Sequence, residues 1–200
     1  MSRINNFNEY EEHCSLAKTD HNAYWSKIAE EFHWYQKWDS VQSGNFNDLN
    51  IKWFDGGKTN MSYNCLDRHL ESKGDKVALI YEDNDPKIPA KNYTYKELHA
   101  EVCRFSNVLK EKGIKKGDRV CFYMSMVPEL LVGVLACTRI GAIHSVVFGG
   151  FSAKALAGRI QDSDCKILIT NDGGYRGDKI IPLKNIADEA LETCPSIESM

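Results

Sequence analysis

From residue 76 onward, short apolar runs alternate with amphipathic stretches. Four runs are apolar at nearly every position rather than at every second one, and they lie near residues 77–82, 118–124, 142–148 and 166–170. Unbroken apolar runs of this length are typical of β-strands that are buried on both faces. We therefore predict four strands in this part of the chain.

The stretches between and after these runs repeat their apolar residues every three to four positions, as amphipathic helices do. The first carries an apolar stripe from Leu98 to Leu109 and ends near Gly113. It should begin after a capping box, in which the Thr94 hydroxyl and the Glu97 carboxylate each accept a hydrogen bond from a free backbone N–H. Further helices are predicted at residues 128–140, 152–162 and 182–192.

Strands that alternate with helices indicate an α/β fold, with a mostly parallel sheet flanked by helices and right-handed connections. Residues 92–95 follow a turn-rich connection, and we expect them to pair back antiparallel to the first strand. The last predicted helix ends shortly before Met200, where such a sheet normally receives its next strand. We therefore expect residues 61–200 to be an incomplete α/β subdomain of a longer protein.

Residues 1–60 lack this alternation and are rich in aromatic and polar residues. Asp20 is placed to cap a helix whose apolar stripe runs from Trp25 to Phe32. Residues 39–50 are rich in Ser, Gly, Asn and Asp, and they predict a surface loop. Because so short a segment seldom forms its own core, we predict a helical and aromatic extension that packs on the domain after it.

The composition is that of an ordinary globular domain, with 42% hydrophobic and 26% charged residues. A net charge of −3 gives no indication of nucleic acid or a membrane surface as partner. The most apolar window, residues 127–147, is interrupted by Glu129, Arg139 and His144, so it predicts a buried helix and strand rather than a membrane span. The start shows no signal-peptide pattern, and the seven cysteines are irregularly spaced, so we expect a cytoplasmic protein with reduced thiols.

Glycine pairs follow the last two predicted strands, at residues 149–150 and 173–174. The carboxyl ends of parallel strands meet at one edge of a sheet, and ligands of open α/β folds bind at that edge. The second pair leads into a segment that contains Arg176 and Lys179. One interpretation is a site for a phosphate-bearing ligand. The other is that the glycines serve turn geometry and that the two cations merely solvate a loop.

The sequence contains none of the common catalytic or nucleotide-binding motifs. It has no Walker loop and no nucleophile elbow, and residues 149–152 lack the third glycine of a dinucleotide-binding fingerprint. We interpret His144, which lies in an apolar strand, as a core histidine rather than a base. Cys65 and His69 are four residues apart in a helix expected within residues 60–74, where packing explains them better than a metal site. The residues alone therefore predict an α/β domain with a candidate phosphate site.

Four segments of the chain resemble AMP-forming acetyl-CoA synthetases, which belong to the acyl-adenylate-forming ligase superfamily. These segments are residues 53–69, 93–98, 141–152 and 175–184. The similarity extends from about residue 24 to the last helix, and more distant acyl-adenylating enzymes do not share the first segment. Propionyl-CoA synthetases and related short-chain ligases resemble the chain closely as well.

The resemblance implies an acetate–CoA ligase. Such an enzyme uses ATP and Mg²⁺ to convert acetate into acetyl-adenylate and pyrophosphate, and then forms acetyl-CoA and AMP with the substrate CoA. In that family the ATP-binding loop, the acyl pocket and the mobile catalytic lysine lie beyond the point where this chain ends. We therefore expect these 200 residues to hold no catalytic residue and no metal, and to be inactive alone. The alternatives are a related ligase such as propionyl-CoA synthetase and a stand-alone nucleotide-binding module.

The resemblance also implies a CoA nucleotide site at the glycine-bearing edge. By their position in the family motifs, its residues are Phe148, Gly149, Gly150, Arg176, Gly177, Asp178 and Lys179, with Ile181 and Pro182 as an apolar shelf for the adenine. Glycines permit close backbone approach, and an arginine offers a planar donor fork for phosphate. Relatives carry arginine in place of Lys179 and a small residue in place of Asp178, which leaves the tightness of phosphate recognition open.

Overall fold

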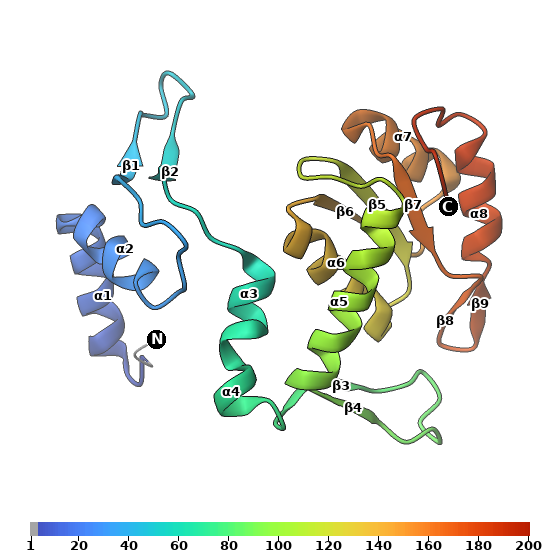
Figure 1. Cartoon of the computed structure of the whole chain (residues 1–200), viewed down its shortest axis with the longest axis horizontal. Coiled ribbons are helices and arrows are strands. Elements are labelled where there is room, and N and C mark those ends of the chain that lie inside the picture. Colours follow the sequence, from blue (N-terminus) through green and yellow to red (C-terminus); the bar gives the residue numbers. More distant parts are fainter. Residues whose placement is uncertain (1–3) are drawn as a thin grey trace. The chain divides into compact units, whose positions relative to one another are not determined.

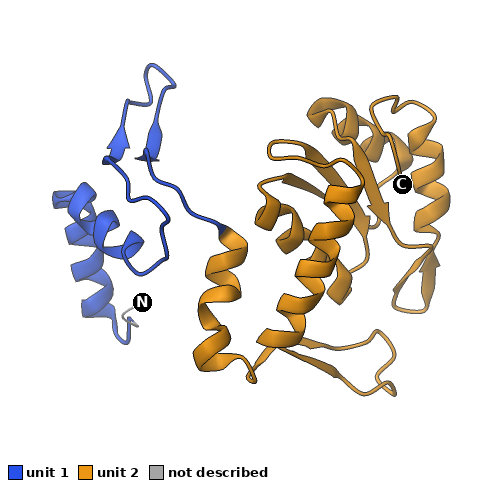
Figure 2. Ribbon diagram, viewed as in Figure 1, with its two compact units in different colours: residues 1–60 blue, residues 61–200 orange. Residues whose placement is uncertain are grey.

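The computed structural model describes residues 4–200. The chain divides into two compact units, residues 1–60 and residues 61–200 (Figure 2), and each is described by itself. No helix within residues 4–200 combines the length and the apolar character that crossing a membrane requires.

The first unit begins with two helices, α1 (Phe7–Thr19) and α2 (His21–Ala29). Asn6 and Asp20 cap them, and each side chain accepts a hydrogen bond at 3.0 Å from the backbone N–H three residues later. The predicted cap at Asp20 is confirmed. Sequence reasoning missed α1, none of whose residues is buried.

A short hairpin follows these helices, in which β1 (Ser40–Ser43) pairs antiparallel with β2 (Lys52–Asp55). The loop predicted for residues 39–50 is therefore wrong at β1. The strand has mostly polar residues and only Val41 is buried within it, so its composition resembled that of a loop. Tertiary pairing overrode the local preference.

Packing within the first unit is mainly aromatic. The rings of Trp34, Trp38 and Phe54 meet with centroids 4.9 to 5.4 Å apart. Among residues 4–60, only Ala29 and Val41 are buried hydrophobic residues. So small an interior agrees with an extension that needs a partner surface, and its packing on the rest of the chain stays a prediction.

The second unit is organised around β5 (Arg119–Met124), which is the centre of a three-stranded sheet within residues 61–200 (Figure 1). β6 (Ile143–Phe148) and β7 (Ile167–Thr170) pair with its two sides, and both run parallel to it. Every residue of β5 after Arg119 is buried. The predicted parallel pairing of the last three strands is confirmed.

The predicted helices flank this sheet. They are α5 (Tyr95–Glu111), α6 (Pro128–Ile140), α7 (Ala153–Ser163) and α8 (Leu183–Leu191). The capping box before α5 is present, because Thr94 Oγ1 accepts the Glu97 N–H at 3.2 Å and Glu97 Oε2 accepts the Thr94 N–H at 2.8 Å. Gly141 ends α6 with a φ of 76°, a left-handed conformation that favours glycine.

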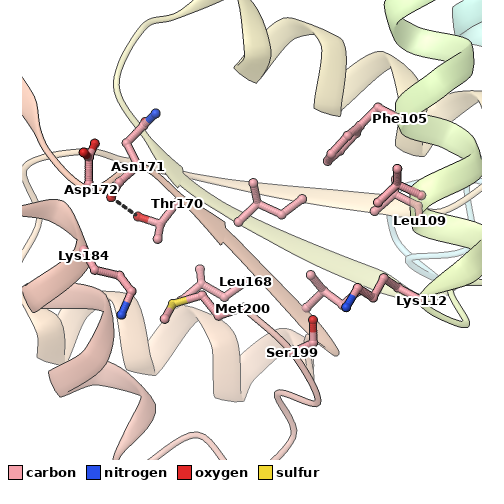
Figure 3. Close-up of a pocket in the computed structure, with 13 residues that line it drawn as sticks. Phe105, Leu109, Lys112, Leu168, Thr170, Asn171, Asp172, Lys184, Ser199 and Met200 are labelled. Atoms are coloured by element: carbon pink, nitrogen blue, oxygen red, sulfur yellow. Dashed lines mark hydrogen bonds between the residues drawn. The ribbon is translucent and has the colours of Figure 1, made fainter.

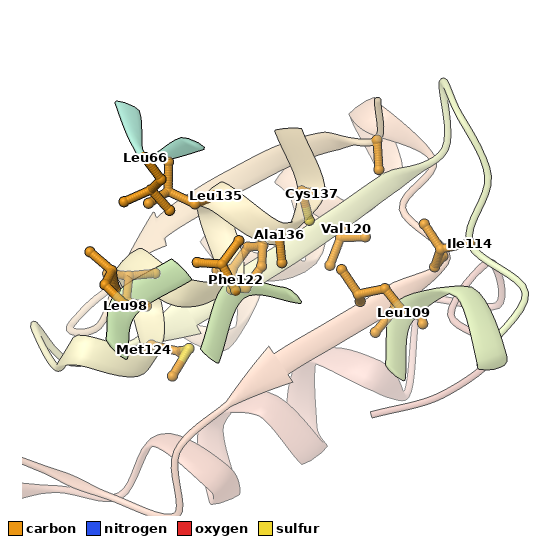
Figure 4. Close-up of a cluster of buried hydrophobic side chains, with 14 residues drawn as sticks. Leu66, Leu98, Leu109, Ile114, Val120, Phe122, Met124, Leu135, Ala136 and Cys137 are labelled. Carbon is orange, nitrogen blue, oxygen red and sulfur yellow. The ribbon is translucent and has the colours of Figure 1, made fainter. Parts of the chain in front are cut away.

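The two faces of the sheet bury separate clusters. α5 and α6 cover one face, against Val120, Phe122 and Met124 of β5 (Figure 4). α7 and α8 cover the other face, against Cys121 and Tyr123. Because successive side chains of a strand point to opposite faces, a strand covered on both sides must be apolar throughout.

β6 departs from the prediction that each strand is buried on both faces. Ile143, Val146 and Phe148 are 53%, 49% and 55% exposed. Within residues 61–200 no strand pairs with the outer edge of β6, so these side chains lie at the rim of the sheet. His144 is only half-buried, and it is therefore not the core residue that its apolar neighbours predicted.

β3 (Val77–Tyr81) does not join the parallel sheet. It pairs antiparallel with β4 (Lys91–Thr94) in a separate hairpin, as expected for residues 92–95. Val77 and Ile80 are 48% and 62% exposed. An apolar run alone therefore did not distinguish this hairpin strand from a strand of the central sheet.

The helix expected within residues 60–74 is broken into three pieces. These are α3 (Met61–Cys65), the 3₁₀ turn η1 (Asp67–His69) and α4 (Leu70–Lys73). Cys65 and His69 therefore do not share one helical face. No group of metal-binding side chains with three or more members occurs in residues 4–200.

The outer edge of β7 borders a groove. Two backbone hydrogen bonds, of 2.8 and 3.2 Å, tie residues 198–199 to residues 166–168, with Ser199 beside β7 in parallel orientation. An apolar groove of about 430 Å³ lies between this edge and α5, and Phe105 and Met200 are among its lining residues (Figure 3).

Candidate functional site

The parallel strands of the second unit end side by side, and polar residues follow them directly. The Ser125 N–H donates a hydrogen bond to Asn171 Oδ1 at 3.0 Å, from the end of β5 to the end of β7. Thr170 Oγ1 donates to the Tyr123 carbonyl at 2.7 Å in the same region. These bonds join the carboxyl ends of the strands into one surface, and the two glycine pairs follow β6 and β7 at that surface.

The first glycine pair is constrained by packing. A Cβ atom on Gly149 would lie 2.7 Å from the Met124 carbonyl oxygen, and one on Gly150 would lie 3.1 Å from the Phe148 ring. Gly149 is therefore required for close approach of two strand ends, which supports the geometric interpretation for this residue. The Phe148 ring is exposed and stands 6.0 Å, centroid to centroid, from that of Phe151.

The second glycine pair does not itself make the turn that we predicted. It leads into a hairpin, in which β8 (Gly174–Arg176) pairs antiparallel with β9 (Lys179–Ile181). The turn consists of Gly177, whose φ of 60° is left-handed, and Asp178. A two-residue Gly-Asp loop between short strands is a recognised hairpin signal. This hairpin could therefore have been predicted from the sequence.

Arg176 and Lys179 stand opposite each other across this hairpin. Both are exposed, and neither forms an ion pair with another side chain of residues 4–200. Residues directly opposite in an antiparallel pair have Cβ atoms about 4.5 to 5.5 Å apart, so the two cations are close enough to repel. An anion bound between them would relieve that repulsion.

A cavity of about 540 Å³ opens beside the hairpin. Its lining consists of residues 81–84, Ile88, residues 124–127, Phe148, Gly149, residues 173–176 and Ile181. The predicted site residues among these are Phe148, Gly149, Arg176 and Ile181. Gly177 and Asp178 line an adjoining cavity of about 480 Å³, whereas Gly150, Lys179 and Pro182 line neither. None of the nine predicted site residues lines the groove shown in Figure 3.

Sequence reasoning missed the wall that the β3–β4 connection contributes. Asn84 Nδ2 donates a hydrogen bond to the Gly177 carbonyl at 3.1 Å and so ties residues 82–88 to the hairpin turn. The two residues are 93 positions apart in the chain, and no local pattern announces such a contact. The sequence presented this segment only as a turn-rich connection.

Charge is unevenly distributed around the larger cavity. Arg176 lines it together with Glu82 and Asp83. The Tyr81 hydroxyl lies 3.4 Å from Asp83 Oδ2, and the pKa of Tyr81 is raised, first by desolvation and then by the Asp83 charge. Carboxylates accept hydrogen bonds from hydroxyl and amino groups, whereas a guanidinium binds phosphate. The cavity therefore offers a guanidinium to an anionic group, carboxylates to hydroxyl or amino groups, and apolar surface at Phe148.

Residues 66–199 match the family described as AMP-binding enzyme, which is more than half of the chain. The chain belongs to the AMP-binding enzyme family. Residues 10–65 match a second family model, described as acetyl-coenzyme A synthetase N-terminus. The resemblance drawn from residues 53–69 and 141–152 is thereby confirmed.

Curated relatives of this AMP-binding enzyme family member are named acetyl-coenzyme A synthetase. The protein of Bdellovibrio bacteriovorus is 50% identical over 182 residues, which are 90% of this chain and 28% of the relative. That of Syntrophobacter fumaroxidans is 52% identical over 182 residues, with the same two shares. That of Alkalilimnicola ehrlichii is 50% identical over 192 residues, or 96% of this chain and 30% of the relative. The chain thus spans less than a third of the length of these relatives.

Proposed function

We propose that this chain is part of an acetate–CoA ligase, which forms acetyl-CoA, AMP and pyrophosphate from acetate, ATP and CoA through acetyl-adenylate. The match of residues 10–65 to the acetyl-coenzyme A synthetase N-terminus carries the proposal. Identities of 50 to 52% with proteins of that name support it. In the longer protein, ATP with Mg²⁺ serves the adenylation step and CoA accepts the acetyl group.

Within this chain, the carboxyl edge of the sheet binds the nucleotide part of CoA. Arg176 and Lys179 hold a phosphate group, because they face each other across the hairpin without an ion-pair partner in residues 4–200. Phe148, Ile181 and Pro182 contact the adenine ring. Phe148 is exposed and Ile181 is half-buried at the cavity wall, so both offer apolar surface to a ligand.

The remaining site residues act through the backbone and through shape. Gly150 and Gly177 have no side chain and let a ligand approach the main chain closely, whereas Gly149 lets the ends of β5 and β6 come together beside the site. Asp178 brings a negative charge next to the phosphate contacts, and Asp83 does the same from the other wall of the adjoining cavity. These carboxylates accept hydrogen bonds from hydroxyl or amino groups of the nucleotide. Because they repel its phosphate, the phosphate stays beside Arg176.

The test of activity compares the protein encoded by the complete gene with the 200-residue chain. The complete protein should release pyrophosphate from ATP only when acetate is present, and should then form acetyl-CoA. The chain alone should show neither step, since it has no Walker-type or Ser/Thr/Gly-rich ATP loop in its sequence. Turnover by the chain alone would contradict this placement of the catalytic machinery.

Two further outcomes separate the alternatives. A higher kcat/KM for propionate than for acetate would reassign the protein to a propionyl-CoA synthetase. A gene that encodes no continuation beyond this chain, together with measurable nucleotide binding, would indicate a stand-alone binding module.

A further inference from the structure

The β8–β9 hairpin is packed at its base and open at its tip. At the base, a Cβ atom on Gly174 would collide with Ser125 Oγ, so the two segments are in close contact there. Tyr175 and Ile180, the next pair along the hairpin, are exposed. The tip, residues 176–179, consists of charged residues and one glycine that are all exposed, so packing does not hold it in place.

One hydrogen bond holds the tip. Asn84 Nδ2 donates to the Gly177 carbonyl at 3.1 Å. Within residues 4–200, no other hydrogen bond joins residues 174–181 to a residue outside the hairpin. Each strand of this hairpin has three residues, and so short a two-stranded ribbon is marginally stable at best in water. The position of the tip therefore depends on Asn84.

The segment that carries Asn84 is fixed by bonds of its own. Asp83 Oδ1 accepts the Asp85 N–H at 3.0 Å, and Asp85 Oδ1 accepts the Lys87 N–H at 3.0 Å. Aspartate side chains that bond to the backbone two residues on form compact turns. The antiparallel pairing of β3 with β4 holds both ends of the segment. Asn84 therefore ties the hairpin tip to an ordered part of the unit.

The tethered carbonyl belongs to the residue that directly follows Arg176. Arg176 and Lys179 face each other across the two-residue turn, so any movement of Gly177 carries both cations with it. An anion can contact both of them only while the tip stays in one position beside the cavity that Arg176 lines. Without the tether, binding of the anion would also have to order the tip, and the ordering of a loop lowers affinity.

We propose that Asn84 is a positioning residue of the nucleotide site, which holds the hairpin tip so that Arg176 and Lys179 contact the phosphate group of CoA together. The inference rests on the proposed function, because its ligand is the one assigned to that site. A direct contact between Asn84 and the nucleotide is the competing role, since Asn84 lines both cavities beside the hairpin. In the positioning role Asn84 acts only through the two cations, and this difference can be measured.

The first experiment needs no ligand. Nitrogen relaxation measured by NMR gives the order parameters of residues 175–180 in the 200-residue chain and in Asn84→Leu, whose side chain is similar in size but has no donor. We expect values of about 0.85 in the parent and below about 0.6 in the variant. Asn84→Gln keeps the amide and should restore part of the order.

The matched control is Asn185→Leu, at an exposed position of α8 that lines none of the cavities described above. It should leave the order parameters of the hairpin unchanged. A parent tip that is already flexible, or an Asn84→Leu tip as ordered as that of the parent, would overturn the proposal. Asn84→Ala, which also lacks the donor, takes the place of Asn84→Leu if the latter is unfolded.

The second experiment measures affinity by NMR titration with CoA and with dephospho-CoA. Asn84→Leu should raise the Kd for CoA about threefold, because fewer conformations of the tip allow the phosphate contacts. The Kd for dephospho-CoA should change less. In the Arg176→Ala background, Asn84→Leu should weaken CoA binding little further, since the principal group that it positions is then absent.

The outcomes of this titration separate the inference from the function on which it rests. If CoA still shifts residues 175–182 and Asn84→Leu binds it as tightly as the parent does, the positioning role is wrong and the proposed site stands. If the losses in Asn84→Leu and Arg176→Ala multiply in the double variant, Asn84 contacts the ligand directly and does not act by positioning. If CoA shifts none of these residues in the parent, the proposed CoA site is wrong, and the inference fails with it.

Discussion

At the scale of single residues, Arg176 and Lys179 limit the affinity of the proposed CoA site. Both side chains are exposed, and exposed charges are screened within about 8 to 10 Å at physiological ionic strength. Two such contacts correspond to binding in the millimolar range, or about −4 kcal/mol. We therefore expect this chain to bind CoA weakly and to lose it as salt is added.

Arg176→Ala should weaken CoA binding by about 1 kcal/mol, roughly fivefold, because one charge-assisted phosphate contact is lost. Arg176→Lys should restore only part of it, since lysine lacks the planar fork. NMR titration with CoA and with dephospho-CoA measures both effects, and Lys110→Ala on the exposed side of α5 is the matched control. Shifts should centre on residues 148–152 and 175–182 and be smaller without the 3′-phosphate. An Arg176→Ala variant that titrates like the parent would leave this hairpin with no ligand role.

Asp67 makes stability depend on acid. Its pKa is lowered from 3.8 in the folded chain, since Arg139 outweighs desolvation. The unfolded chain therefore binds the proton first, and the stabilisation that is present above pH 3.8 is lost as the pH falls through the folded pKa. Asp67→Asn should flatten this acid dependence and lower the free energy of unfolding at pH 7 by about 1 to 3 kcal/mol.

Urea denaturation at pH 7 and across the acid range checks this expectation. Asp188→Asn, which breaks an exposed pair with Lys184, is the control and should cost less than about 0.5 kcal/mol. The acid dependence should shrink without vanishing, because Glu97 and Asp118 also have lowered pKa values. An unchanged pH profile in Asp67→Asn would contradict the assigned role.

At the scale of elements, the predictions succeeded where the signal is local. The capping box of Thr94 and Glu97 and the end of α6 at Gly141 involve residues at most a few positions apart, and both are present. The β8–β9 hairpin was not predicted, because the turn was assigned to the glycine pair at residues 173–174. The chain reverses instead at the single glycine Gly177, whose backbone is left-handed. Local chemistry thus predicts the ends of elements better than it predicts which of two neighbouring turns reverses the chain.

Two helical glycines should respond to alanine in opposite directions. A Cβ on Gly133 of α6 would collide with the Phe122 ring, so Gly133→Ala overpacks the core and should destabilise the chain by about 1 to 3 kcal/mol. A Cβ on Gly158 of α7 meets no atom within 4 Å, so Gly158→Ala should stabilise by about 0.5 to 1 kcal/mol. Midpoints of urea denaturation measure both. Equal effects of the same sign would show that α6 can move away from β5.

At the scale of the whole molecule, the α/β class and the parallel order followed from the sequence, but the exposure of β6 and the separate β3–β4 hairpin did not. Strand burial depends on which segments lie alongside, and an apolar run such as residues 143–148 is the same string whether or not a neighbour covers it. The site followed in part. Its glycine-bearing edge is visible in the sequence, whereas the wall formed by Asn84 depends on a contact between distant segments.

The central position of β5 also has a consequence in time. Both of its neighbours come later in the chain, and the Thr170 hydroxyl that bonds to the Tyr123 carbonyl is synthesised 47 residues after it. At about 5 to 20 residues per second, the most buried strand waits roughly 2 to 10 seconds for its last partner. α6 follows β5 directly and can cover Phe122 early, but the side of Cys121 and Tyr123 stays open until α7 and α8 have emerged. That side of a nascent chain is the one that chaperones would have to shield.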